Sequence, residues 1–147
     1  MSILKNSCWD ASIDSSRTVD GATYAGAAVQ VFDKNLAFVG VYSAPLPKAK
    51  THTEAVHSAV LLAAGQAKKA GADSARIIVS LQCVITHYEA YEAERGSIDK
   101  RFTDKMDKAL NLGIEIQLQL MKKELDNSWA AYANLQARAR SAAEKQQ

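Results

Sequence analysis

Residues 51–82 read THTEAVHSAVLLAAGQAKKAGADSARIIVSLQ, and this stretch decides the fold. Alanine and leucine recur in its first part at intervals of three and four residues, which predicts an amphipathic helix over residues 51–70 that ends at Gly71. Residues 76–82 are almost continuously apolar, as is typical of a strand that pairs in parallel beneath helices. With a strand before it, the segment therefore predicts a right-handed strand–helix–strand crossover.

Upstream of this segment, the sequence predicts three strands over residues 4–13, 24–32 and 36–43. Residues 14–21 are rich in turn-forming types, which predicts a loop between the first two strands. Asp33-Lys34-Asn35 has the length of a hairpin turn between the second and third. The three strands are expected to form an antiparallel meander.

Downstream, short helices are predicted over residues 86–94 and 99–112. Residues 114–120 read IEIQLQL, and this strict alternation of apolar and polar types predicts a half-buried strand at an edge of the sheet. Capping residues precede an alanine-rich segment over residues 129–144, which predicts a final helix.

The composition is that of a globular protein. The chain has 147 residues, the length of one domain, so a single domain is expected over residues 1–147. The sequence contains neither an apolar run long enough for a bilayer span nor an N-terminal signal pattern, and it has two cysteines. We therefore expect a soluble, intracellular (cytoplasmic) protein without membrane association. Its formal net charge of +2 is too small to indicate nucleic-acid binding by itself.

Four segments carry a resemblance to a known superfamily. Residues 9–12 (WDAS) resemble the Asp-x-Ser of the first strand in the ribonuclease H-like superfamily, and residues 25–33 (AGAAVQVFD) resemble its glycine-containing second strand. Residues 53–64 (TEAVHSAVLLAA) are similar to its helix around the catalytic glutamate. Residues 133–138 (ANLQAR) resemble its last helix, where Ala-Asp-x-x-Ala is usual. The resemblance implies an α/β (α+β) fold with a five-stranded mixed sheet, three strands antiparallel and the others parallel, flanked by helices.

The same resemblance implies a site and a chemistry. Enzymes of this superfamily cleave a phosphodiester with two divalent metal ions, Mg²⁺ or Mn²⁺, held by carboxylates. It assigns catalytic and metal-ligand roles to Asp10 and Glu54. The other two acidic positions of the family correspond to Gln82 or Ser80, and to Asn134, which are neutral. The formal charge of the site would fall from −4 to −2, so efficient two-metal hydrolysis is not expected.

Each site residue also has a structural interpretation. Thr51-His52-Thr53-Glu54 fits a capping box, in which Thr51 caps the helix and Glu54 reaches back to the cap. An unpartnered carboxylate at Asp10 in a buried strand would be costly, which favours a functional or hydrogen-bonded role. Asn134 is equally well explained as a solvent-facing helix residue.

Histidines, cysteines and basic residues complete the set of candidates. His52, His57 and His87 lack the spacing of zinc ligands, and a structural role is expected for them. Cys8 and Cys83 are expected on neighbouring strands as reduced thiols. The candidate nucleic-acid contacts are Lys48, Lys50, Lys100, Arg101, Lys105 and Lys108. Asp99, Asp104 and Asp107 interleave with the last four, which favours a solvated face of mixed charge.

Three functions remain open from the sequence. The leading hypothesis is a ribonuclease H-like protein with an impaired metal site that binds RNA, an RNA–DNA hybrid or a nucleic-acid-processing partner rather than cleaving efficiently. The second is an active, divergent Mg²⁺- or Mn²⁺-dependent ribonuclease. The third is an assembly module or homo-oligomer that uses the strand at residues 114–120 and the final helix.

Overall fold

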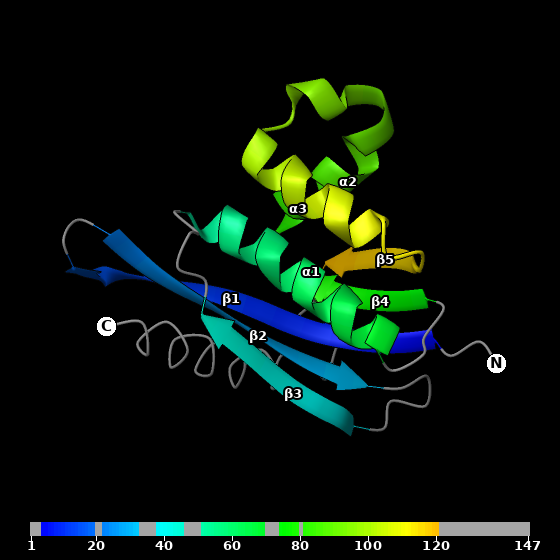
Figure 1. The fold of residues 1–147 in the computed structure, drawn as a ribbon, viewed down its shortest axis with the longest axis horizontal. Coiled ribbons are helices and arrows are strands. Elements are labelled where there is room, and N and C mark those ends of the chain that lie inside the picture. The colour runs from blue at the N-terminus through cyan, green and yellow to red at the C-terminus, as the bar shows by residue number, and fades with distance from the viewer. Residues whose placement is uncertain are drawn as a thin grey trace.

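The computed structural model describes residues 4–19, 22–32, 38–45, 51–69, 74–79 and 81–120 of the chain (Figure 1). These ranges contain five strands and three α-helices, with one short 3-10 helix before α3. The elements are β1 (Leu4–Val19), β2 (Ala22–Phe32), β3 (Phe38–Pro45), α1 (His52–Lys69), β4 (Ser74–Val79), α2 (Gln82–Glu94), η1 (Arg95–Ser97), α3 (Lys100–Leu110) and β5 (Glu115–Leu120).

The strands form one mixed sheet in the order β3-β2-β1-β4-β5. β1 pairs with β2 and β2 with β3 in antiparallel fashion, whereas β4 pairs in parallel with both β1 and β5. The predicted meander, the parallel fourth strand and the edge position of the strand at residues 114–120 are thus confirmed. β1 lies at the centre of the sheet, between the antiparallel and the parallel parts.

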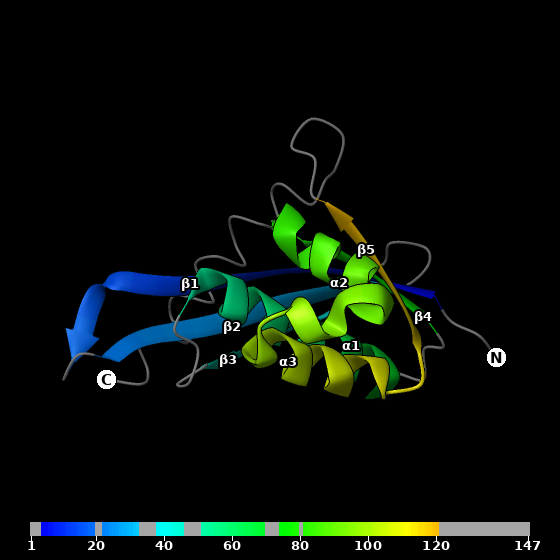
Figure 2. The same ribbon diagram turned by 90° about the horizontal axis from the view of Figure 1, so that it is seen from above.

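Helix α1 lies across one face of this sheet, and α3 runs beside α1 (Figure 1). Seen from above, α2 lies near β5 (Figure 2). The residues that α1 buries are mostly alanines, which allow its backbone to approach the strands closely. The buried apolar side chains of α1 are Ala55, Val56, Ala59, Val60, Ala63, Ala64 and Ala67, and they pack with Ala75, Ile77 and Val79 of β4 and Val84 of α2. None of the helices that the structure describes is long and apolar enough to cross a membrane.

Several strand boundaries differ from the sequence prediction, and β2 and β3 each begin two residues away from their predicted starts. β1 continues to Val19, so the loop predicted at residues 14–21 is wrong for most of its length. After an irregularity, the pairing of β1 with β2 resumes, with Thr18 opposite Thr23 and Val19 opposite Ala22. This pairing satisfies backbone N–H and C=O groups that a turn would leave to solvent. β3 includes Pro45, which an edge strand tolerates since one side of its backbone needs no partner.

Strand β4 also ends earlier than predicted, and helix α2 begins earlier than predicted. β4 ends at Val79, and Gln82 is the first residue of α2, which starts before the predicted residue 86. The apolar run at residues 76–82 therefore spans two elements. Val84 explains this, because as a helical residue it reaches the core and is buried there. α3 starts after Asp99, whose side chain accepts a hydrogen bond from the Arg101 N–H at 2.8 Å. The helix predicted at residues 129–144 lies outside the described residues.

Thr51 provides the cap of α1, as predicted. Its hydroxyl oxygen accepts a hydrogen bond from the Glu54 N–H at 3.1 Å. We expect Thr51→Ala to lower the free energy of unfolding by about 1 kcal/mol, because one N–H of the first turn loses its acceptor. Thr51→Ser should retain most of this stability. Urea denaturation of the three proteins measures the difference, and equal losses in both variants would contradict the capping role.

Candidate functional site

The strand position of Asp10 places it near the carboxyl end of β4. In the parallel pair of β1 and β4, Cys8 lies opposite Ile78, and Asp10 follows two residues later in the same direction. In the antiparallel pair of β1 and β2, Asp10 lies opposite Ala28. Asp10 is therefore on the central strand, one residue beyond the level at which β4 ends at Val79. The metal-ligand role that the resemblance assigns to Asp10 stays a prediction.

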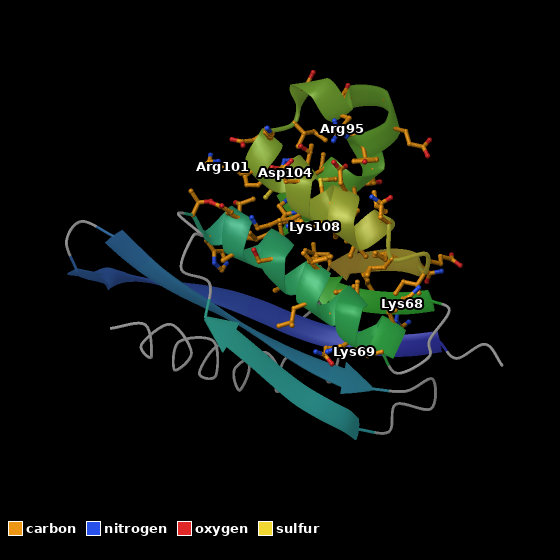
Figure 3. All side chains as sticks on the ribbon, in the orientation of Figure 1. Lys68, Lys69, Arg95, Arg101, Asp104 and Lys108 are labelled. Atoms are coloured by element: carbon orange, nitrogen blue, oxygen red, sulfur yellow. The ribbon has the colours of Figure 1, made fainter. Side chains whose placement is uncertain are left out.

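Glu54 lies in the first turn of α1 and is buried, with 4% of its surface exposed. Its carboxylate is ion-paired with two cations of α3: Oε1 lies 3.6 Å from Lys105 Nζ, and Oε2 lies 3.9 Å from Arg101 Nη1. Figure 3 shows Arg101 at the beginning of α3, close to the first turn of α1. The predicted cap by Thr51 and a charged role for Glu54 thus coexist, because the hydroxyl takes the backbone N–H while the carboxylate faces α3.

Arg101 is shared between two carboxylates. Asp99 accepts from its guanidinium at 2.9 Å, and this side-chain hydrogen bond is the main reason why the pKa of Arg101 is raised. The charge of Glu54 raises that pKa further, but less. The same hydrogen bonds lower the pKa of Asp99 to about 2. Arg101 therefore joins the cap of α3 to the first turn of α1.

One turn beyond Glu54, His57 is fully buried in a cluster of rings. Its Nε2 lies 2.9 Å from Nδ1 of His87, at hydrogen-bond distance. Its ring stacks on Phe102 at a centroid distance of 4.9 Å and on Tyr88 at 6.0 Å. The cluster thus joins α1, α2 and α3. The His57–His87 pair could not be predicted from the sequence, because the spacing of the two histidines matches no ligand motif.

Burial sets the protonation state of His57. Loss of solvent, together with the smaller effects of the nearby charges of His87 and Lys105, lowers its pKa to about 3. Nδ1 of His57 is buried and has no hydrogen-bond partner among the described residues. The neutral ring is therefore best satisfied when Nε2 carries the hydrogen and donates to His87 Nδ1, since an unpaired acceptor costs less than an unpaired N–H. Burial also lowers the pKa of His52 and of His87.

Of the neutral candidates, Gln82 lies in the described part of the chain. Gln82 is exposed at the start of α2, and its Nε2 donates to Thr86 Oγ1 at 3.5 Å. Ser80 and Asn134 lie outside the described residues. Within the described ranges, no group of three or more histidine, cysteine, aspartate or glutamate side chains could hold a metal ion.

Cys83 is exposed on α2, which corrects the prediction that it lies on a strand beside Cys8. The strand ends before it, at Val79. Its Sγ lies 4.0 Å from Thr53 Oγ1, across the space between α2 and α1. Cys8 is on β1, opposite Ile78 of β4.

The basic residues of α3 divide into two groups. Arg101 and Lys105 pair with Glu54, as described above. Lys100 and Lys108 are exposed, and neither forms an ion pair with a residue in the described ranges. Asp107 is occupied by Arg95 and by the hydroxyl of Tyr91, so α2, η1 and α3 are tied together at this end. Lys48 and Lys50 lie outside the described residues.

Comparison with known proteins yields structural matches alone. No family model and no curated protein matches the sequence. Among solved structures, ribonuclease H1 of Halobacterium salinarum matches with a TM-score of 0.71 and 16% identity, covering 97% of this chain and 98% of that chain. The N-terminal ribonuclease H domain of a Mycobacterium tuberculosis protein matches with a TM-score of 0.74 and 14% identity, covering 98% and 96%.

A third solved structure is similar over the same length. It is LC11 ribonuclease H1 in complex with an RNA/DNA hybrid, with a TM-score of 0.69 and 13% identity, covering 97% of both chains. These similarities extend over nearly the whole of each chain. The protein therefore has the α/β fold of ribonuclease H, as the sequence resemblance implied.

Proposed function

We propose that this protein uses a ribonuclease H fold to bind nucleic acid, either RNA or an RNA–DNA hybrid, and that it cleaves its ligand weakly or not at all. The observation that carries the proposal is the pairing of Glu54 with Lys105 and Arg101, since a carboxylate expected to hold a metal ion faces two protein cations instead. The neutral residues Gln82 or Ser80, and Asn134, support the same conclusion.

A pair of divalent ions does not fit the donors that the structure describes. Mg²⁺ and Mn²⁺ prefer several oxygen ligands, usually carboxylates. Glu54 supplies a carboxylate whose surroundings are positive, and Gln82, one candidate for a third ligand, is exposed and bonded within α2. Asp10 has a suitable strand position, but Glu54, the other acid that the resemblance assigns to the site, is already ion-paired with Lys105 and Arg101.

Nucleic-acid binding is supported by the two exposed cations of α3. Lys100 and Lys108 are not engaged by described carboxylates and can neutralise phosphates. In the similar LC11 structure the ribonuclease is complexed with an RNA/DNA hybrid, which makes this polymer the first ligand to test. Such binding would weaken steeply as salt rises, because it releases counterions from the phosphates.

The test separates binding from cleavage. We expect the purified protein to bind a fluorescent RNA–DNA hybrid in fluorescence anisotropy, and to leave the strand intact in a gel assay with Mg²⁺ or Mn²⁺. Asp10→Asn should leave this binding within about twofold, because one removed charge changes a diffuse electrostatic interface little. Cleavage that is strong in the wild-type protein and abolished by Asp10→Asn would establish an active ribonuclease instead.

A second candidate function is protein assembly, and the position of β5 favours it. β5 is an edge of the described sheet, and an unpaired strand edge can accept another strand. A pocket of about 270 Å³ lies next to it, lined by Ile85, Tyr88, Glu89, Ile116 and Leu118. Salt-insensitive self-association in sedimentation, without affinity for RNA, DNA or the hybrid, would favour this candidate over nucleic-acid binding.

A further inference from the structure

We propose that Lys105, assisted by Arg101, is the built-in counter-ion of Glu54 and takes the place of a divalent cation at the first turn of α1. The inference rests on the impaired metal site of the proposed function and names the residues responsible. The same ion pairs attach α3 to the first turn of α1, and we call Glu54, Arg101 and Lys105 together the latch.

The geometry leaves each carboxylate oxygen of Glu54 facing its own cation. Lys105 Nζ lies 3.6 Å from Oε1 and Arg101 Nη1 lies 3.9 Å from Oε2. A magnesium ion bound to Oε1 at about 2.1 Å would lie within roughly 6 Å of the Lys105 ammonium, so the two cations would repel each other. Lys105 in this position therefore weakens the binding of a divalent ion at Glu54.

Burial makes Lys105 the stronger of the two partners. The side chain of Glu54 is 5% exposed and that of Lys105 is 24% exposed, whereas that of Arg101 is 50% exposed. Solvent and salt screen a half-exposed pair more than a mostly buried one. Arg101 is also bonded to Asp99, so its charge is divided between two carboxylates. Lys105 should thus dominate the competition with a metal ion.

The charge of Lys105 also affects a second residue of α1, His57. The ammonium of Lys105 is one of the charges that lower the pKa of His57, after burial and His87. His57 lies one turn after Glu54 on α1, so Lys105 acts on two consecutive turns of that helix. Arg101 and Lys105 are four residues apart on α3 and hence share one face. The latch is thus a cross-helix feature and not a loose surface pair.

The experiment measures metal binding in the full chain by two methods, the Mn²⁺-dependent shift in melting temperature and the depletion of free Mn²⁺ in electron paramagnetic resonance. We compare wild type, Lys105→Met and Lys69→Met. Lys69 is a matched control because it is an exposed lysine of α1 at the opposite end from Glu54 (Figure 3). The latch predicts that Lys105→Met binds Mn²⁺ on the order of tenfold more tightly than either other protein. Adding Glu54→Gln should remove the gain.

Two results would overturn the latch. One is Mn²⁺ binding by the wild-type protein that is as tight as in Lys105→Met and that Glu54→Gln abolishes. The other is a Lys105→Met variant that responds to Mn²⁺ like Lys69→Met. Circular dichroism establishes that each variant is folded, and Lys105→Gln replaces Lys105→Met if the latter is not.

Hybrid binding, measured on the same samples, keeps this test separate from the proposed function. A wild-type protein that binds no nucleic acid would refute the proposed function, whereas a Lys105→Met variant that still gains Mn²⁺ would support the latch. Conversely, a wild-type protein that binds the RNA–DNA hybrid and binds Mn²⁺ at Glu54 as tightly as Lys105→Met does would refute the latch and leave nucleic-acid binding intact.

Discussion

Truncation of Ile77 to alanine is expected to lower the free energy of unfolding by about 2–5 kcal/mol. Ile77 is fully buried in β4, opposite Ser7 of β1 and Leu118 of β5. It belongs to the core cluster formed by α1, α2 and β4. The shorter side chain would leave a cavity where the sheet and the helices meet, and close packing allows little relaxation there.

Ile77→Val is the matched control for this variant. It removes one methylene and keeps the β-branched shape that suits a strand, so the expected loss is only about 0.5–1.5 kcal/mol. Urea denaturation followed by circular dichroism measures both. Equal losses for alanine and valine would mean that neighbouring side chains fill the space, and that Ile77 does not fix the position of β4 beneath α1.

The second large effect is a loss of stability in mild acid that originates at His57. In the unfolded chain a histidine has its ordinary pKa near 6.5, whereas burial lowers the pKa of His57 to about 3 in the folded protein. Between these values the unfolded state binds a proton and the folded state does not. The free energy of unfolding should therefore fall as pH falls below about 6.5, by up to about 1.4 kcal/mol per pH unit.

His57→Phe tests the origin of this slope. Phenylalanine can keep the stack on Phe102 but cannot bind a proton. Between pH 6.5 and 4.5 the free energy of unfolding of the variant should therefore fall less steeply with decreasing pH, by the amount that corresponds to about one proton. This window lies above the range in which Asp99 and Asp107 titrate, since their pKa values are lowered by their arginine partners. Urea denaturation at several pH values measures the slope.

His52→Phe serves as the control, because burial also lowers the pKa of His52 but no ring cluster is described around it. It should leave the larger part of the slope in place. A slope that survives His57→Phe and disappears in His52→Phe would assign the acid sensitivity to the wrong histidine and contradict the prediction.

Local periodicity was sufficient to predict the elements that make the fold. The alanine and leucine repeat defines α1 to within one residue at each end, and alternation in residues 114–120 predicts both β5 and its edge position. The prediction was wrong where a boundary depends on distant pairing. The end of β1 is set by its ladder with β2, and the start of α2 is set by burial of Val84.

In the candidate site, too, some features follow from the sequence and others do not. A carboxylate on the first turn of α1 follows from the sequence pattern, and so does its cap by Thr51. The roles assigned to Asp10, Ser80, Asn134, Lys48 and Lys50 stay predictions. Arg101 and Lys105 were expected to face nucleic acid, and that role also stays a prediction, but the structure pairs both with Glu54.

By itself, therefore, the sequence determined the order of strands and helices, the fold they resemble and the position of Glu54 at a helix start. These features depend on near neighbours, whose side chains repeat with the period of a helix or a strand. Only the tertiary structure decided that Glu54 meets Lys105 and Arg101, and that His57 meets His87 in a buried stack. Such contacts join residues far apart in the chain, and packing of α1 against α2 and α3 determines which side chains face each other.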